Sequence, residues 1–163
     1  NDLAAEAIQW TMDALTGSHI DLLTRLPLEH REGDWHFVHG SPERPATFPY
    51  IFSSSEAAAA LKATDARLTF VGHSHRAFIY SEDEGEVVSV EGLIAAPNAR
   101  CLVNVGSVGQ PRDRDPRASF GVVDDENLAL ELVRVAYDLP RAQAKILEAG
   151  LPPFLAERLS VGN

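Results

Sequence analysis

The chain has 163 residues, of which 45% are hydrophobic and 23% charged, values that are ordinary for one globular domain. Its formal net charge of −10 disfavours a nucleic-acid polymer as partner and favours a small phosphate-bearing or peptide substrate. A single cysteine excludes an internal disulfide and fits a reducing cytoplasm, and no apolar run approaches the ~18 residues of a membrane span. We therefore expect one cytoplasmic domain over residues 1–163, without a membrane partner.

The first third of the chain predicts two helices followed by a β-hairpin. Apolar residues recur at helical spacing over 2–15, and a second, shorter helix ends before Pro27. Two strands over 28–31 and 35–39 flank an acidic turn that contains glycine. The loop over 41–53 then carries three prolines and three aromatic residues. Such a loop either contributes specificity over a site or is an ordinary crossover, and both interpretations stay open.

The rest of the chain predicts strands and turns between helices. An alanine-rich helix over 56–63 precedes the apolar strand 68–71, an order typical of a βαβ crossover. Further strands are predicted over 77–80, 86–91, 100–105, 119–123 and 128–136, and helices over 140–149 and 152–159. This order predicts an α/β protein with helices outside its sheets and a helical tail over 137–163.

Three histidines follow apolar, strand-like runs and stand near glycine. His39 follows one such run, and His73 and His75 follow another, the strand 68–71 and its glycine. Neutral imidazole is a standard ligand for divalent transition metals, and strand ends can present such rings to one cleft. The pattern favours a metal centre, and a metal centre favours hydrolysis. The alternative for each residue is a histidine satisfied within the core.

A glycine-rich turn over 104–113 follows another apolar strand. Its backbone amides could bind an anion, and Arg112 could add a bidentate contact to phosphate. Alternatively, the arginines and aspartates over 112–117 alternate as in a solvated, self-paired loop. The remaining histidines belong to no motif and are interpreted as surface or strand residues: His19, His30 and His36.

Several of these segments together resemble one known family. The segments are 38–42, 72–76, 104–112, 134–138 and 150–159. They resemble the later motifs and the tail of calcineurin-like metallophosphoesterases, most closely the small bacterial predicted phosphodiesterases. The resemblance implies an α/β/β/α sandwich of two mixed sheets with outer helices and the metals at the strand ends.

The resemblance also implies a chemistry and a set of site residues. Two divalent ions (Mn, Fe, Zn or Co) would activate a hydroxide that hydrolyses phosphodiesters, with small phosphate esters as substrates. By motif, His39 and His73 would ligate one ion and His75 the other. Arg76 and Arg112 are weaker candidates for contacts with the substrate phosphate.

The N-terminal motifs of this family are not found before these segments in the sequence. The sequence contains neither Gly-Asp-x-x-Asp nor Gly-Asn-His-Asp, and no first strand with Asp-x-His precedes the helix that opens the chain. We therefore expect the chain to correspond to the C-terminal two-thirds of such a domain. The remaining ligands and the general-acid histidine would lie on an N-terminal segment of the same protein, and this chain alone would be inactive. The alternative is a divergent, non-catalytic module that binds proteins on the same scaffold.

Overall fold

A computed structural model describes the chain apart from residues 1, 86, 89–90, 95–98, 125 and 127–128. The chain forms two compact units, one of Leu28–Tyr137 with Gly162–Asn163 and one of Asn1–Pro27 with Asp138–Val161. No helix in the described part of the chain is both long and apolar enough to cross a membrane. The assignment of 1–163 to a single domain remains a prediction.

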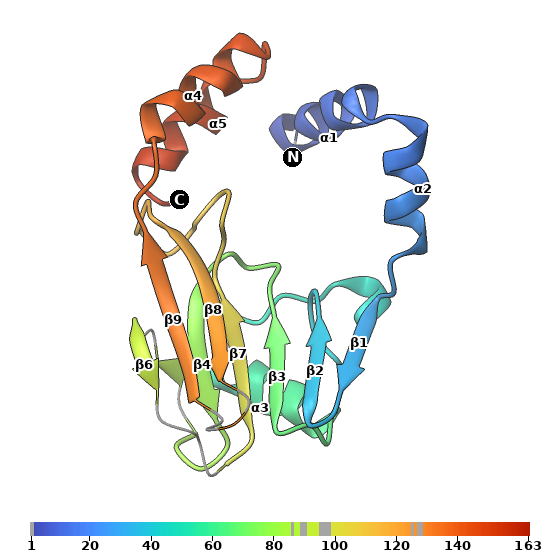
Figure 1. The fold of residues 1–163 in the computed structure, drawn as a ribbon, viewed down its shortest axis with the longest axis vertical. Helices are drawn as coiled ribbons and strands as arrows, with labels where there is room; N and C mark the ends of the chain where they lie inside the picture. Colours follow the sequence, from blue (N-terminus) through green and yellow to red (C-terminus); the bar gives the residue numbers. More distant parts are fainter. Residues whose placement is uncertain (1, 86, 89–90, 95–98, 125, 127–128) are drawn as a thin grey trace. The chain divides into compact units, whose positions relative to one another are not determined.

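The larger unit is built on a six-stranded sheet with the order β1-β2-β3-β7-β4-β5 (Figure 1). Its strands are β1 (Glu29–Glu32), β2 (Trp35–Val38), β3 (Leu68–Val71), β4 (Ala77–Ser81), β5 (Val87–Val88) and β7 (Cys101–Val105). The neighbours β2, β3 and β7 run parallel, whereas β1, β4 and β5 pair antiparallel. The predicted mixed sheet is thus confirmed, together with the predicted hairpin and crossover.

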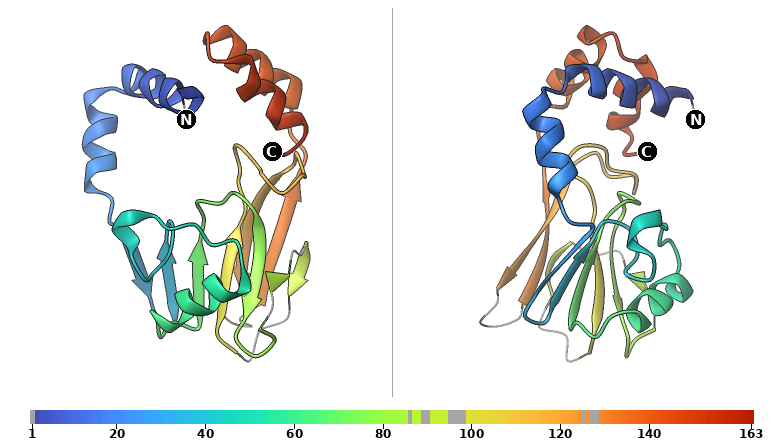
Figure 2. Two further views of the ribbon diagram at one scale, coloured as in Figure 1. Left: turned by 180° about the vertical axis from the view of Figure 1, so that it is seen from behind. Right: turned by 90° about the vertical axis from the view of Figure 1, so that its right-hand side faces the viewer.

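A second sheet and one helix cover the two faces of this sheet (Figure 2). The second sheet contains β6 (Gly92–Ile94), β8 (Ala118–Asp124) and β9 (Ala129–Val135), and the helix is α3 (Ser54–Lys62). All pairings described in the second sheet are antiparallel, and the predicted α/β architecture with helices outside the sheets is confirmed. The sequence patterns did not predict β6, which has only three residues.

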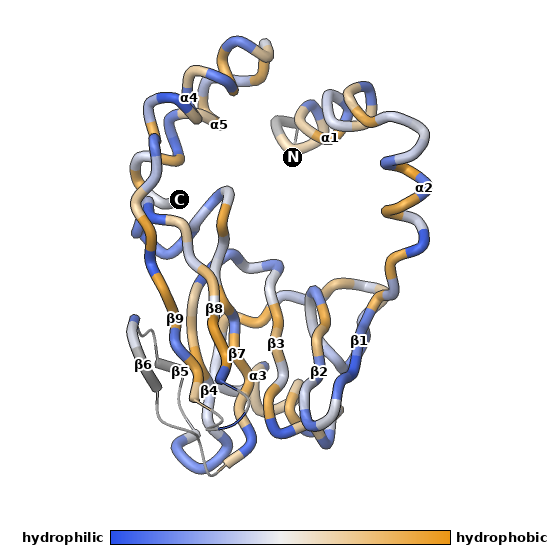
Figure 3. Tube along the Cα trace, in the orientation of Figure 1, coloured by the Kyte–Doolittle hydropathy of each residue, from blue (hydrophilic) through white to orange (hydrophobic). Residues whose placement is uncertain are grey.

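The side chains of the central strands point alternately to the two faces of the sheet, and each face has its own hydrophobic core. On one face, Leu68, Phe70 and Val103 pack with residues of β9, and on the other face Leu102 packs with α3. Adjacent side chains of a strand point to opposite faces, so a nearly continuous apolar run fits a strand buried on both sides. These runs are the orange segments of β3 and β7 in Figure 3. Cys101 is 2% exposed within this core, as predicted for a small buried hydrophobe.

Helix α3 begins directly after the loop over 41–53, and the residues at its start fix its position. The Ser53 side chain accepts a hydrogen bond from the Glu56 amide, and the Glu56 carboxylate accepts one from the Ser53 amide. This reciprocal capping box satisfies two backbone donors at the start of the helix. Hydrogen bonds from Phe52 and Ser53 lower the pKa of the Glu56 carboxyl. The cap also holds the end of the loop over 41–53, which contains η1 (Pro45–Thr47).

The smaller unit is helical. It contains α1 (Asp2–Ala14), α2 (Gly17–Arg25), α4 (Leu139–Glu148), α5 (Pro153–Glu157) and η2 (Arg158–Ser160). Thr16 caps α2 and Asp138 caps α4, both through side-chain oxygens. The Gln143 amide nitrogen donates to the Ala156 carbonyl at 2.9 Å, which connects α4 to α5.

One strand predicted for the larger unit, over 86–91, lies partly outside the described residues.

Candidate functional site

The carboxyl ends of the parallel strands β2, β3 and β7 meet at one edge of the sheet. His39 follows β2 directly, and Gly72 and His73 follow β3. The Gly72 amide donates to the His39 carbonyl at 2.9 Å, so the backbone joins the two strand ends. In open α/β sheets, ligands bind outside the carboxyl ends of the strands. His39 and His73, which the sequence predicts to lie at strand ends, are found at this edge.

His39 and His73 are brought together from positions 34 residues apart. The distance between His39 Nε2 and His73 Nδ1 is 3.0 Å. Two imidazole nitrogens bound at about 2.1 Å from one ion, at right angles, would also be about 3.0 Å apart. The pair therefore fits the spacing of two ligands on one divalent cation.

Both histidines of the Gly72–His75 turn adopt left-handed backbone conformations. The φ angle is 61° at His73 and 57° at His75. Non-glycine residues pay about 1–2 kcal/mol for this region, and such strained residues cluster at active sites. The turn thus holds two imidazoles in place against a local backbone cost.

The ring of His75 is oriented by the loop that follows β7. Its Nδ1 lies 2.7 Å from the Gln110 carbonyl oxygen. A carbonyl can only accept, so Nδ1 carries the proton and Nε2 is the nitrogen able to ligate a metal. The Arg112 amide also donates to the His75 carbonyl at 3.0 Å. A ligating histidine is usually held by such a hydrogen bond from its other ring nitrogen.

The environment of His73 favours its neutral form. Burial lowers the pKa of the His73 ring first, and electrostatic interaction with His39, His75 and Arg112 lowers it further, because each of these groups disfavours a second positive charge beside it. A neutral ring keeps the lone pair that a metal requires. The Arg112 guanidinium donates from Nη2 to Gln110 Oε1 at 2.9 Å, while its Nε is buried and makes no hydrogen bond within the described chain. Arg112 is therefore held beside the histidines with donor capacity remaining.

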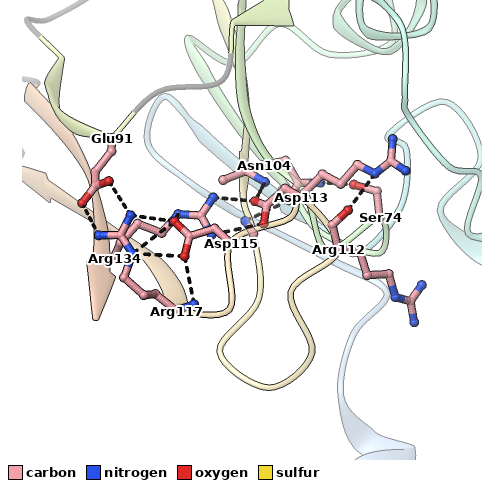
Figure 4. Close-up of polar contacts among 11 residues, drawn as sticks. Ser74, Glu91, Asn104, Arg112, Asp113, Asp115, Arg117 and Arg134 are labelled. Carbon is pink, nitrogen blue, oxygen red and sulfur yellow. Dashed lines mark hydrogen bonds and ion pairs between the residues drawn. The ribbon is translucent and has the colours of Figure 1, made fainter. Parts of the chain in front are cut away.

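Asn104 connects the histidine turn to the glycine-rich turn, a role the sequence patterns did not predict. This residue is fully buried at the end of β7, opposite Val71 of β3. Its amide nitrogen donates to the Gly72 carbonyl at 2.7 Å and to Ser74 Oγ at 2.9 Å (Figure 4). Its amide oxygen accepts from the Gly106 amide at 3.0 Å. One side chain thereby positions both turns, and its signal in the sequence is a polar residue ending a buried apolar run.

The glycine-rich turn itself uses its amides internally. Besides the Gly106 amide, the Gly109 and Gln110 amides donate to Ser107 Oγ, at 3.2 and 2.9 Å. These three amides are therefore not available to an anion, and binding of an anion by the rest of the turn stays a prediction. At Gly106, where φ is +82°, an added Cβ would lie 2.8 Å from the Ser119 side chain, so glycine is required.

The charged residues after this turn form a network that is partly buried, not a solvated loop (Figure 4). Arg134 of β9 and Asp113 are only 7% and 10% exposed, and they form an ion pair at 2.5 Å. Asp113 also accepts from the Ala77 amide at 3.0 Å, at the point where β4 leaves the histidine turn. Arg117, which binds Asp115 and Glu91, extends the network toward solvent. The interpretation of a solvated, self-paired segment is thus wrong for Asp113.

The other three histidines take no part in this edge. His36 is 1% exposed, with Nδ1 3.0 Å from Thr64 Oγ1 and Nε2 2.7 Å from Glu29. It completes an Asp-x-His pattern with Asp34, but both lie at the amino end of β2, away from the strand ends that carry His39. His19 and His30 are exposed, as predicted for surface residues.

Within the described residues, no three histidine, cysteine, aspartate or glutamate side chains gather into one metal site. The structure pairs His39 with His73 and holds His75 separately through Gln110. Arg76 is exposed next to them and donates from Nε to the Arg112 carbonyl at 3.2 Å. The described chain thus places two facing imidazole nitrogens at one point, a third imidazole at another, and two cationic side chains beside them.

The chain is similar to known proteins over its whole length. A family model described as the calcineurin-like phosphoesterase superfamily domain matches residues 4–127. The uncharacterized protein MJ0912 of Methanocaldococcus jannaschii is 38% identical over 168 residues, which cover 100% of this chain and 68% of that protein. A crystal structure of a metallophosphoesterase from Sphaerobacter thermophilus has a TM-score of 0.93 at 37% identity, over 100% of this chain and 69% of the other. The hypothetical protein PH1004 of Pyrococcus horikoshii OT3, at 20% identity with a TM-score of 0.79 over 62% of its chain, is alike in fold alone.

Proposed function

The chain belongs to the calcineurin-like phosphoesterase superfamily, and from this premise we propose that its protein hydrolyses phosphodiesters with two divalent cations. The observation that carries the proposal is the pairing of His39 Nε2 with His73 Nδ1 at 3.0 Å on the carboxyl edge of the sheet. The two nitrogens are at hydrogen-bond distance from each other, and the same separation is the one that two ligands at right angles on one ion require. Manganese, iron, zinc or cobalt would suit these nitrogen donors better than calcium.

The three histidines have separate tasks in this proposal. His39 and His73 would bind one cation through the facing nitrogens, and His75 would bind the other through Nε2. Bound cations supply Lewis-acid chemistry, because they polarise phosphoryl oxygens and lower the pKa of a water nucleophile. The Gln110 carbonyl keeps His75 in the required tautomer, and Asn104 keeps the turn that carries both rings in place.

Arg112 and Arg76 would bind and orient the phosphate. Arg112 is close enough to His73 to lower the pKa of that ring, and its Nε is not used by a hydrogen bond among the described residues. Guanidinium groups match phosphate oxygens with paired donors. Two such groups beside the histidines favour a phosphate ester over a neutral substrate. The net charge of −10 favours a small ester over a nucleic-acid polymer.

Three imidazoles are too few ligands for two cations, since zinc alone takes four and octahedral metals take six. We therefore propose that further ligands and a general-acid histidine come from an additional segment of the same protein. In that case residues 1–163 by themselves would bind metal weakly and would not turn over substrate. The remaining third of each relative's length leaves room for such a segment in those proteins.

The direct test is hydrolysis of bis(p-nitrophenyl) phosphate by the full protein. We expect activity that is lost on treatment with a chelator and restored by Mn²⁺, because the cations supply the activated nucleophile. Residues 1–163 expressed alone should remain inactive under the same conditions. A full protein that binds no metal and shows no turnover would instead support a non-catalytic, protein-binding module on this scaffold.

A further inference from the structure

The segment that carries Arg112 runs alongside the end of the histidine turn. His75 Nδ1 lies 2.7 Å from the Gln110 carbonyl oxygen, and the Arg112 amide donates to the His75 carbonyl at 3.0 Å. The Arg76 side chain donates from Nε to the Arg112 carbonyl at 3.2 Å. Three hydrogen bonds thus join the two segments, and groups of these two segments make all three of them.

A fourth hydrogen bond connects the two segments to a buried charge. The Ala77 amide, directly after Arg76, donates to Asp113 Oδ2 at 3.0 Å, and Ala77 is only 2% exposed. Arg134 donates from Nη2 to Asp113 Oδ2 at 2.5 Å and from Nη1 to Oδ1 at 3.3 Å (Figure 4). Because Arg134 belongs to β9, Asp113 fastens both segments to the second sheet.

The chemistry of this contact favours a positioning role over a purely stabilising one. A buried ion pair can often be replaced by an apolar pair of similar volume without loss of stability. An apolar side chain, however, cannot accept a hydrogen bond from the Ala77 amide. The paired donors of a guanidinium hold a carboxylate in one orientation, so the Asp113 oxygen that accepts from Ala77 has a fixed place. That oxygen then determines where the chain leaves the histidine turn.

We propose that Asp113 is a positioning residue that fixes His75 for binding its divalent cation, an assignment that rests on the proposed function. The Asp113 carboxylate, held by Arg134, keeps the segment after Gln110 against the histidine turn. The Gln110 carbonyl then stays on Nδ1 of His75, and Nε2 stays directed to the cation. Groups that orient a metal ligand in this way raise the metal affinity without touching the metal.

The two cations should respond differently to the loss of Asp113. The strand ends that carry His39 and His73 are joined by the hydrogen bond from the Gly72 amide to the His39 carbonyl. That contact does not include Asp113. Removing the Asp113 carboxylate should therefore weaken binding of the cation at His75 and leave the cation between His39 and His73 largely unaffected.

The test measures the Kd of both Mn²⁺ ions by calorimetry in the full protein and in two double variants. Asp113→Leu/Arg134→Met puts apolar side chains in place of the ion pair and removes the acceptor for the Ala77 amide. Asp113→Asn/Arg134→Met removes the same charges but keeps an oxygen that can accept. We expect the leucine variant to bind one ion about 10–100-fold more weakly and the other as in the wild type. The asparagine variant should bind both nearly as the wild type does, and His75→Ala, which should lack the weakened ion, identifies it.

The matched control is Asp65→Leu/Arg31→Met, which removes an exposed ion pair and should leave both Kd values unchanged. Wild-type affinity for both ions in the leucine variant would overturn the positioning role. So would a loss of about tenfold or more in the asparagine variant, since that variant keeps the acceptor. Either result in a protein whose wild type binds two ions and hydrolyses bis(p-nitrophenyl) phosphate would remove this assignment alone. A wild type that binds no Mn²⁺ and shows no turnover would remove the proposed function, and this assignment with it.

Discussion

Replacing His73 by alanine is expected to lower kcat/KM for bis(p-nitrophenyl) phosphate about 10³-fold or more in the full protein. His73 Nδ1 faces His39 Nε2 at 3.0 Å, so its removal leaves His39 as the single ligand from this pair. A divalent cation contributes several kcal/mol to stabilising charge in phosphoryl transfer, and losing it accounts for an effect of this size. Steady-state rates at saturating Mn²⁺ measure the change.

Two further variants separate loss of the ligand from loss of the fold. His73→Gly suits the φ of 61° and should be as inactive as His73→Ala, yet more stable by about 1 kcal/mol because glycine is unstrained there. His30→Ala removes an exposed histidine of β1 and should keep wild-type rates. Activity in either His73 variant within about tenfold of the wild type would argue against a metal role for this residue.

Replacing Arg134 by methionine is expected to lower the stability of the protein substantially. The side chains of Asp113 and Arg134 are only 10% and 7% exposed. The change therefore leaves a buried carboxylate without its cationic partner. Breaking a buried ion pair on one side typically costs 3–5 kcal/mol, and Asp115, which also lies near Arg134, is a second carboxylate that loses its contact with this cation. We expect a loss of about 3 kcal/mol in the free energy of unfolding at pH 7, measured by denaturant titration. The control Arg31→Met breaks an exposed pair with Asp65 and should cost less than about 1 kcal/mol.

The cost of Arg134→Met should depend on pH. Burial alone would raise the pKa of Asp113, but hydrogen bonds from Arg134 and from the Ala77 amide lower it below its ordinary value. A carboxyl with a lowered pKa stabilises the folded state above its unfolded pKa, near 3.9, and this contribution disappears as the pH falls through the folded value. The difference between wild type and variant should therefore be full at pH 7 and shrink below about pH 4. A difference that is constant with pH would show that Arg134 acts through packing instead.

Much of the fold could be predicted from local patterns. The strand β3 occupies Leu68–Val71 as the apolar run predicts, and the hairpin and most helix positions agree within a residue or two. These elements depend on periodicity and caps, which are local properties of the sequence. The strand β6 was missed because three residues carry too little pattern, and its pairing with β9 decides its structure.

The site depended on contacts between distant positions. The pairing of His39 with His73 joins residues 34 apart, and it follows from the parallel strands β2 and β3 that the crossover predicts. In contrast, no local pattern indicates that Asp113 pairs with Arg134, 21 residues away. The stacking of Tyr50 on His73 likewise depends on how the loop folds back, which its prolines and aromatic residues did not specify.

The central claim is that the full protein binds two divalent cations, one of them between His39 and His73. The most direct measurement is the manganese content per protein after equilibration with Mn²⁺ and removal of free metal. We expect two ions in the wild type and in His30→Ala, and one ion in the double variant His39→Ala/His73→Ala. A wild type that holds no ion, or a double variant that still holds two, would contradict this assignment.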